Sequence, residues 1–282
     1  MTGSELVGLI PKEALLMAGR HYLEKQGKSP GVPEEELIRM AVRSLGLGDV
    51  APFEPQKKII EYQVREPGPA LAGMTLRGFI DELSMDSPAP GGGSVAALCG
   101  ALAAALAAMV ANLTVGKKGY EAVCADMIAT AVRAQALKDA LLEAVDADTQ
   151  AFNKVMEAFR LPKTTPEQSE EKDRAVEEAN KEATLVPLQV LEKAVEAVGL
   201  ARAAAAKGNK NSISDAGVAG LAGQAAGEGA YYNVLINLAG IKDADFSDRV
   251  RRQAAGFKKA LDKEGKAVRD LIAKALAGPK PA

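Results

Sequence analysis

Histidine and cysteine are nearly absent from this sequence of 282 residues, which has one histidine, two cysteines and no tryptophan. A single histidine, His21, excludes His-based zinc sites and Ser-His-Asp triads from the main part of the chain, so we expect no metal. Its surroundings, GRHYLEKQ, predict an exposed position on a helix. Acid–base chemistry must therefore come from carboxylates, lysines, tyrosines or bound water.

The chain also lacks a basic excess, an export signal and a plausible disulfide. Its net charge is −2 and its pI about 5.7, so nucleic acid is not an expected partner. The N-terminus has no positive region, continuous apolar run or small-residue cleavage site, and we expect a cytoplasmic protein. Cys99 and Cys124 lie in apolar helical sequence, where a thiol is usually a small buried side chain.

One long apolar run is present, from Val95 to Ala111, and it has no charged residue. Its length approaches the roughly 20 residues of a membrane span. Alanine occupies more than half of it, however, and neither aromatic residues nor basic flanks mark its ends. We therefore expect no membrane contact. The run predicts a buried helix at the centre of a helical domain, at a subunit interface, or both.

A glycine-rich loop opens directly into this apolar helix, in the stretch DSPAPGGGSVAALCGALAAALAAMVANL from Asp86 to Leu113. Three glycines at 91–93 allow a sharp bend or a close approach to a ligand, and Ser94 can cap the helix. The free N–H groups of the helix start favour an anion. A plain turn followed by an N-cap is the commoner arrangement, and the loop alone does not decide between the two.

The periodicity of apolar residues divides the chain into two parts. Residues 1–65 predict a small α/β module, with the strands ELVGLI and KKIIEYQV around two helices, and 66–74 reads as a linker. Residues 75–282 predict a mainly all-α domain, a helical bundle of about six helices. These are expected near 75–84, 94–115, 119–160, 166–206, 213–240 and 243–277.

Three polar clusters interrupt the helical pattern. In VDADTQAFNKVMEAFRLPK, Asp146 and Asp148 are two residues apart and point in different directions, so their spacing does not favour a paired-carboxylate site. A solvated acidic face explains them equally well. In GNKNSISDAGVAG, Ser212 and Asp215 fit a capping box, which would give Asp215 a structural role.

The third cluster is YYNVLIN, where Asn233 and Asn237 are four residues apart on an apolar helix. Buried asparagines need hydrogen-bond partners, which an interhelical network or a ligand would supply equally well.

In their order and spacing, four motifs resemble the cyclodeaminase domain of formimidoyltransferase-cyclodeaminase. They are PAPGGGSVAALCGALAAALAAMVANLTVGKKGY, DADTQAFNKVMEAFRLPK, GNKNSISDAGVA and YYNVLIN, within residues 75–275. Residues 1–65, with SELVGLIPKEALL and LGLGDVAPFEPQKKIIEY, resemble the end of the formimidoyltransferase part. The resemblance implies a truncated transferase remnant that does not itself transfer formimidoyl groups.

The resemblance implies a reaction in which 5-formimidoyltetrahydrofolate closes to 5,10-methenyltetrahydrofolate and releases ammonia. No cofactor or metal is required, only orientation and a carboxylate that moves the proton. Asp215 is the preferred carboxylate and Asp148 the second. The folate-binding residues implied by the motifs are Pro90, Gly91, Gly92, Gly93, Ser94, Asn112, Lys117, Lys163, Asn209, Asn211, Ser214, Asn233 and Asn237.

Two other functions stay open. Methenyltetrahydrofolate cyclohydrolase shares the methenyl compound and the tetrahedral chemistry, and a non-catalytic folate-binding or scaffold subunit would suit the short N-terminal module. Three partners are expected: a folate substrate, a second copy of the chain in a homodimer or larger assembly, and a separate formimidoyltransferase. The folate is either the plain or the polyglutamylated form.

Overall fold

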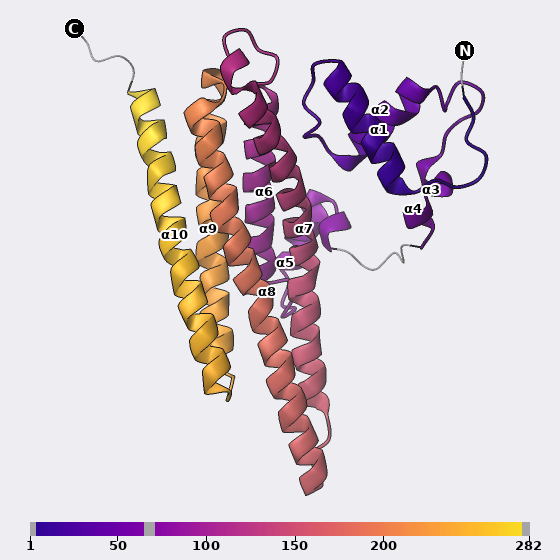
Figure 1. Cartoon of the computed structure of the whole chain (residues 1–282). Helices are drawn as coiled ribbons and strands as arrows, with labels where there is room; N and C mark the ends of the chain where they lie inside the picture. Colours follow the sequence, from indigo (N-terminus) through magenta and orange to yellow (C-terminus); the bar gives the residue numbers. More distant parts are fainter. Residues whose placement is uncertain (1–3, 65–70, 278–282) are drawn as a thin grey trace.

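The computed structural model of this chain describes residues 4–64 and 71–277 (Figure 1). Its long helices run side by side along one axis, and a module of short helices lies beside one end of them (Figure 1). No strand ladder forms within the described residues. The predicted mainly all-α fold is confirmed.

The main domain contains five long helices and one short one. They are α5 (Leu76–Leu83), α6 (Gly92–Asn112), α7 (Cys124–Arg160), α8 (Pro166–Lys207), α9 (Ile213–Leu238) and α10 (Ala244–Leu276). The six ranges predicted from periodicity match these helices except for a few terminal residues. Short 3-10 turns, η1 (Leu71–Gly73), η2 (Glu121–Val123) and η3 (Lys210–Ser212), precede α5, α7 and α9.

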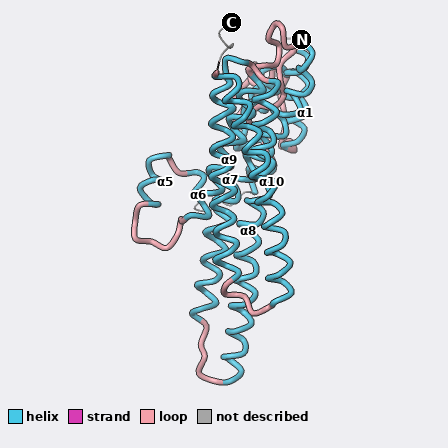
Figure 2. Tube along the Cα trace, turned by 90° about the vertical axis from the view of Figure 1, so that its left-hand side faces the viewer, coloured by secondary structure: helices cyan, strands magenta, loops and turns pink. Residues whose placement is uncertain are grey.

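Four of these helices form a bundle, in which α6 and α8 each pack on α7 and α9. Helix α10 lies against α8 and α9, and α5 stands out from one side, as Figure 2 shows. Small residues make close packing possible: a Cβ atom added to Gly223 would lie 2.6 Å from Cγ2 of Val198. Close helix–helix approach therefore depends on alanine and glycine at these contacts.

Helix α6 is long and apolar enough to cross a membrane by length and composition, and 61% of its most apolar window is buried inside the protein. It packs against α7, α8 and α9, and most of its alanines are fully buried. Its apolar character is therefore explained by burial in the bundle, as the sequence predicts.

The N-terminal module differs from its prediction, because it is helical rather than α/β. Its helices are α1 (Lys12–Lys25), α2 (Glu34–Leu45), α3 (Pro55–Lys58) and α4 (Ile60–Val64). The two predicted strands meet only at one isolated parallel bridge, between Ile10 and Ile59. Two segments without further strands beside them cannot build a stable ladder. Because no sheet covers the first segment, its apolar residue Val7 is left 89% exposed.

The module nevertheless has its own small core. Leu15, Leu16 and Leu23 of α1 pack with Leu37 and Ile38 of α2, and Ile59 closes the cluster. His21 is exposed on α1, as predicted. Most of the predicted linker, residues 66–70, lies outside the described residues.

Candidate functional site

The glycine loop brings the start of α6 against the middle of α7. A Cβ atom added to Gly93 would lie 2.0 Å from Oδ1 of Asp148, so only glycine leaves room for this carboxylate. The Ser94 hydroxyl is fully buried and lies 3.1 Å from both Oδ2 of Asp148 and the Val145 carbonyl oxygen, which are the two acceptors open to its single hydrogen. It also lies 3.3 Å from Oγ1 of Thr149.

The structure also shows what lies at the start of α6. Gly91, and not Ser94, occupies the N-cap position, and no side chain caps the helix. The prediction that Ser94 caps α6 is wrong, because its hydroxyl is committed to α7. The carboxylate at the helix start is the protein's own Asp148, and binding of an anionic ligand there stays a prediction.

Asp148 is a half-buried carboxylate with a raised pKa. Loss of water around it raises the pKa above the usual aspartate range, and the hydroxyl and backbone N–H of Ser94 partly oppose this shift. Asp146, two residues earlier, accepts a hydrogen bond from the backbone N–H of Leu71. The two carboxylates thus have different neighbours, as their spacing predicts.

Asn233 on α9 lies beside the same loop. A Cβ atom added to Gly92 would be 3.8 Å from its Nδ2, which donates to the Gly229 carbonyl at 2.8 Å. We call Gly91–Ser94, Asp148, Thr149 and Asn233 the glycine-loop cluster. Asn237, one turn further along α9, donates to the Ala183 carbonyl of α8 at 2.9 Å, which is the interhelical contact that the sequence left open.

A second polar cluster lies at the opposite end of α6. Lys117 Nζ donates to Oδ1 of Asn209 at 2.8 Å, and the same oxygen accepts the backbone N–H of Asn211 at 3.1 Å. The Asn209 N–H donates to the buried hydroxyl of Thr114 at 2.8 Å. Tyr120 Oη accepts the backbone N–H of Lys210 at 3.0 Å.

We call Thr114, Lys117, Tyr120, Asn209 and Asn211 the lysine cluster. Lys117 has no carboxylate partner among residues 4–64 and 71–277. Its loop borders a hollow of about 340 Å³ lined by Gly116, Lys117, Lys118, Tyr120, Glu121 and Cys124. A cation with neutral partners beside a hollow suits an anionic ligand group.

Asp215 and Ser214 begin α9 next to the lysine cluster. The predicted capping box does not form, because the N-cap residue Ser212 makes no side-chain cap hydrogen bond. Asp215 is half-buried and makes no hydrogen bond or ion pair within the part of the chain that the structure describes.

The remaining predicted residues lie apart from both clusters or border them. Pro90 is buried just ahead of the loop, and Lys163 is exposed in the turn between α7 and α8. Asn112, at the end of α6, donates from Nδ2 to the Gly31 carbonyl of the N-terminal module at 2.7 Å.

Within one chain the predicted residues therefore do not form one pocket. The glycine-loop cluster and the lysine cluster sit at opposite ends of α6, which has 21 residues. At roughly 1.5 Å of rise per residue, the helix separates them by about 30 Å. Sequence order does not reveal this, because each helix carries the chain from one end of the bundle to the other, and successive motifs fall at the same end or at opposite ends according to their place along the helix.

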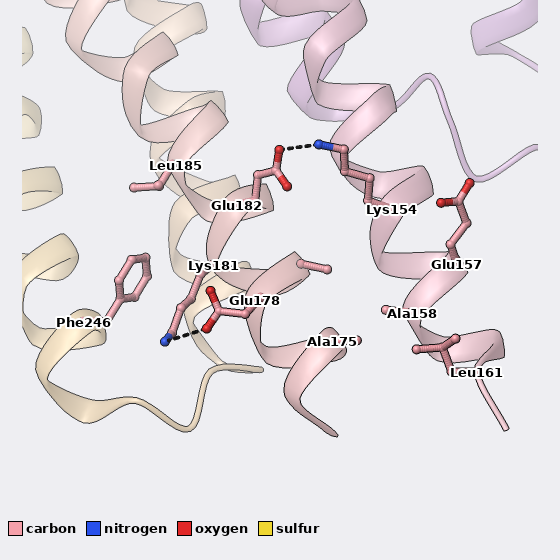
Figure 3. Close-up of a pocket in the computed structure, with 11 residues that line it drawn as sticks. Lys154, Glu157, Ala158, Leu161, Ala175, Glu178, Lys181, Glu182, Leu185 and Phe246 are labelled. Atoms are coloured by element: carbon pink, nitrogen blue, oxygen red, sulfur yellow. Dashed lines mark hydrogen bonds and ion pairs between the residues drawn. The ribbon is translucent and has the colours of Figure 1, made fainter. Parts of the chain in front are cut away.

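A cavity of about 630 Å³ lies beyond the glycine-loop cluster, between α7, α8 and the start of α10 (Figure 3). No motif in the sequence predicts this cavity. Its charged side chains mostly pair with one another, as in the Lys154–Glu182 ion pair between α7 and α8. The lining residues are Lys154, Glu157, Ala158, Leu161, Ala175, Glu178, Ala179, Lys181, Glu182, Leu185 and Phe246.

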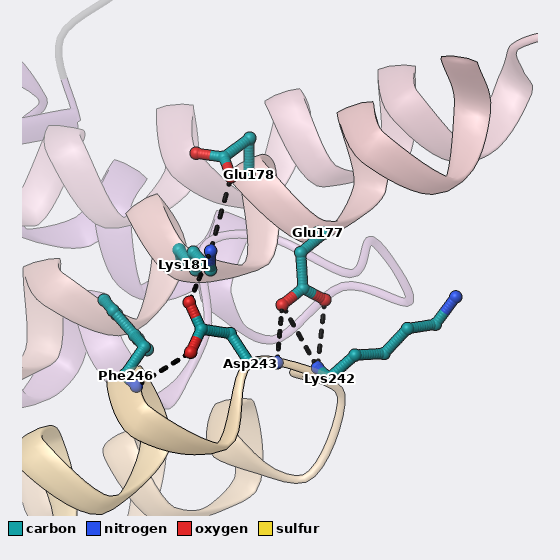
Figure 4. Close-up of polar contacts among 6 residues, drawn as sticks. All are labelled: Glu177, Glu178, Lys181, Lys242, Asp243 and Phe246. Atoms are coloured by element: carbon teal, nitrogen blue, oxygen red, sulfur yellow. Dashed lines mark hydrogen bonds and ion pairs between the residues drawn. The ribbon is translucent and has the colours of Figure 1, made fainter. Parts of the chain in front are cut away.

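Figure 4 shows how the neighbouring turn is fixed to α8. Asp243 caps α10 by accepting the Phe246 N–H at 3.0 Å and pairs with Lys181 Nζ at 3.0 Å. These contacts lower the pKa of Asp243, the Phe246 N–H most of all. The carboxylate of Glu177 accepts the N–H groups of Lys242 and Asp243. We interpret this network as a brace between helices, since its charges already have partners.

Comparisons with known proteins match both parts of the chain. A family model described as formiminotransferase-cyclodeaminase matches residues 75–256, and one described as the formiminotransferase domain matches residues 1–65. The formimidoyltransferase-cyclodeaminase of Mus musculus is 39% identical over 259 residues, 91% of this chain and 48% of that protein. The chain thus spans about half the length of this relative.

Two shorter proteins match a smaller share of the chain. The methenyltetrahydrofolate cyclohydrolase of Methylorubrum extorquens is 41% identical over 183 residues, 65% of this chain and 88% of that protein. The crystal structure of formiminotetrahydrofolate cyclodeaminase from Thermotoga maritima superimposes with a TM-score of 0.65 at 30% identity, covering 72% of this chain and 98% of that one. With the family match over residues 75–256, these similarities show that the chain belongs to the formiminotransferase-cyclodeaminase family.

Proposed function

We propose that this chain catalyses the cyclodeamination of 5-formimidoyltetrahydrofolate to 5,10-methenyltetrahydrofolate and ammonia. The observation that carries the proposal is the carboxylate of Asp148, held against the glycine loop by Ser94 and given a raised pKa by burial. Family membership supplies the reaction, and Asp148 supplies a group suited to it.

The chemistry needs one proton to move between two nitrogens. N10 of the folate attacks the protonated amidine carbon, and the tetrahedral intermediate must lose the N10 proton before ammonia can leave. A carboxylate can accept that proton and deliver it to the departing nitrogen, so that it ends the cycle unchanged. A raised pKa brings Asp148 closer to the pH at which both transfers are efficient.

Asp148 is favoured over Asp215, which the sequence motif placed first. Asp148 has a hydrogen-bonding hydroxyl that fixes its orientation, whereas Asp215 has no such partner among the described residues. In this proposal the lysine cluster binds the anionic glutamate tail, and Lys117 provides the cation.

The test is turnover of the purified protein with each folate, followed by absorbance of the methenyl compound. Formation of methenyltetrahydrofolate and ammonia from the formimidoyl substrate supports the proposal, and the Asp148→Asn variant should lose this activity while Asp215→Asn retains most of it. Loss in Asp215→Asn alone would reverse the assignment of the two carboxylates.

Methenyltetrahydrofolate cyclohydrolase is the second candidate, favoured by the 41% identity to a relative of that name. Rapid hydrolysis of the methenyl compound without formimidoyl turnover would establish it. Folate binding without either reaction would instead indicate a scaffold subunit for a formimidoyltransferase.

The functional unit that we propose is a homodimer. The adjacent helices α6 and α9, with the residue that follows α6, expose an apolar stripe that a second copy would cover. It is made of Leu102, Met109, Leu113, Val218, Leu221, Tyr232 and Ile236. A two-fold axis across the stripe, perpendicular to the bundle, would pair the helices antiparallel. The glycine-loop cluster of one protomer would then face the lysine cluster of its partner. The dimer would thus bring together two clusters that lie about 30 Å apart within one chain.

A further inference from the structure

One turn of the N-terminal module is buried against the helical bundle. Ser29, Pro30 and Gly31 are all buried, although they connect α1 and α2 on the outside of a small module. The Gly31 N–H donates to the Ser29 hydroxyl at 3.1 Å, which fixes the turn. The Gly31 carbonyl then accepts Nδ2 of Asn112 on α6 at 2.7 Å and Nε2 of Gln135 on α7 at 3.3 Å.

The contact is close enough to require glycine. A Cβ atom added to Gly31 would lie 2.4 Å from Cβ of Ala131, 2.5 Å from its carbonyl carbon and 2.6 Å from the Val132 nitrogen. Two of these three atoms are backbone of α7, which cannot move aside cheaply. The turn therefore rests directly on the main chain of α7.

The same end of α6 holds the lysine cluster. Asn112 is the last residue of α6, and two residues later Thr114 accepts the Asn209 N–H at 2.8 Å. Asn209 in turn accepts Lys117 Nζ at 2.8 Å. Beyond Thr114, a Cβ atom added to Gly116 would lie 3.7 Å from the Gly27 carbonyl oxygen, so the loop that carries Lys117 also runs beside the module.

We propose that the Ser29–Gly31 turn is a positioning element for the lysine cluster, with Gly31 as the positioning residue. By fixing the end of α6 through Asn112, and α7 through Gln135, the module holds Thr114 and the loop that follows it in the geometry that aims Lys117 at an anionic substrate group. The inference rests on the proposed folate reaction. It assigns a role to residues 1–65 that needs no transferase chemistry.

The test compares Gly31→Ala with Gly48→Ala, a matched control in the same module whose added Cβ would meet only a side-chain carbon of Val42 at 4.0 Å. A second variant, Gln135→Glu, keeps the shape of the side chain and replaces one donor to Gly31 by an acceptor. Circular dichroism of the full chain checks that each variant remains helical.

Two readouts follow. Hydrogen exchange at the amides of Asn209 and Lys210 should become faster in Gly31→Ala and Gln135→Glu and stay unchanged in Gly48→Ala. KM for the formimidoyl substrate should rise roughly fivefold in Gly31→Ala, with kcat nearly unchanged. A fivefold rise is the loss of affinity expected when one partly exposed ion pair to the substrate is lost.

Equal exchange and equal KM in Gly31→Ala and Gly48→Ala would overturn the proposal. Faster exchange with unchanged KM would also overturn it, because the contact would then be structural only. If the wild-type chain turns over neither folate, the proposed function fails. The exchange experiment, together with the affinity for tetrahydrofolate measured by calorimetry, then decides the positioning role separately.

Discussion

Gly93→Ala is the sharpest single test of the glycine-loop cluster. The new methyl carbon would lie 2.0 Å from Oδ1 and 2.5 Å from Cγ of Asp148, well inside van der Waals contact. Gly93 is held in place by α6, whereas the carboxylate is the end of a side chain. We therefore expect Asp148 to rotate away and to lose its hydrogen bond from Ser94.

The effect on stability should be small because two contributions oppose each other. Losing a hydrogen bond to a charged group costs about 1.5–3 kcal/mol. Replacing a helical glycine by alanine stabilises the helix by up to about 1 kcal/mol. A carboxylate that turns toward water also avoids the free-energy cost of burial. The net destabilisation should stay near 1 kcal/mol, measurable by urea unfolding.

The effect on activity should be large, since a misplaced acid–base group forfeits about 10²–10⁴ in rate. The assay is kcat for methenyltetrahydrofolate formation under saturating substrate. Gly199→Ala on α8 is the control, because its added Cβ meets nothing within 4 Å. Wild-type kcat in Gly93→Ala would refute the catalytic assignment of Asp148.

Three further predictions concern charge, packing and assembly. The raised pKa of Asp148 means that this group keeps its proton in the folded state just above about pH 4, where it loses the proton in the unfolded chain, so the contribution of Asp148 to stability should fall as pH rises through this window. Asp148→Asn should lack that slope in urea unfolding, and an identical slope would contradict it. Gly227→Ala would place a Cβ atom 2.4 Å from Cδ2 of the fully buried Leu261 and should destabilise the bundle by about 1–3 kcal/mol, which would lower the midpoint of urea unfolding. An unchanged midpoint would show that α10 moves aside without cost. Ile236→Glu, at a side chain 71% exposed in the single chain, should convert a dimer to monomers in light scattering, and a dimer of unchanged mass would exclude this stripe as the interface.

Helix positions in the main domain could be predicted from the sequence because the local signals agree with each other. The helix predicted over 166–206 begins where the structure has a capping box between Thr165 and Gln168, with Pro166 as the first helical residue. Alanine and glycine mark α6 and α9 as helices that approach their neighbours closely. The prediction of an α/β module was wrong because a strand needs partners that local sequence does not supply. The two segments that meet at Ile10 and Ile59 have β-like sequences, but without further strands beside them they form only one bridge.

The sequence by itself determined the all-α class, the family and the list of polar residues that could serve chemistry, because periodicity, caps and motifs are local properties. Only the tertiary structure decided which of those residues meet. In the structure Asp148 contacts Gly93 and Ser94 at one end of α6. Asp215 and Lys117 lie at the other end, where Asn112 donates a hydrogen bond to Gly31 of the module. The physical reason is that contacts between helices depend on the register and direction of packing, which small residues permit but do not specify.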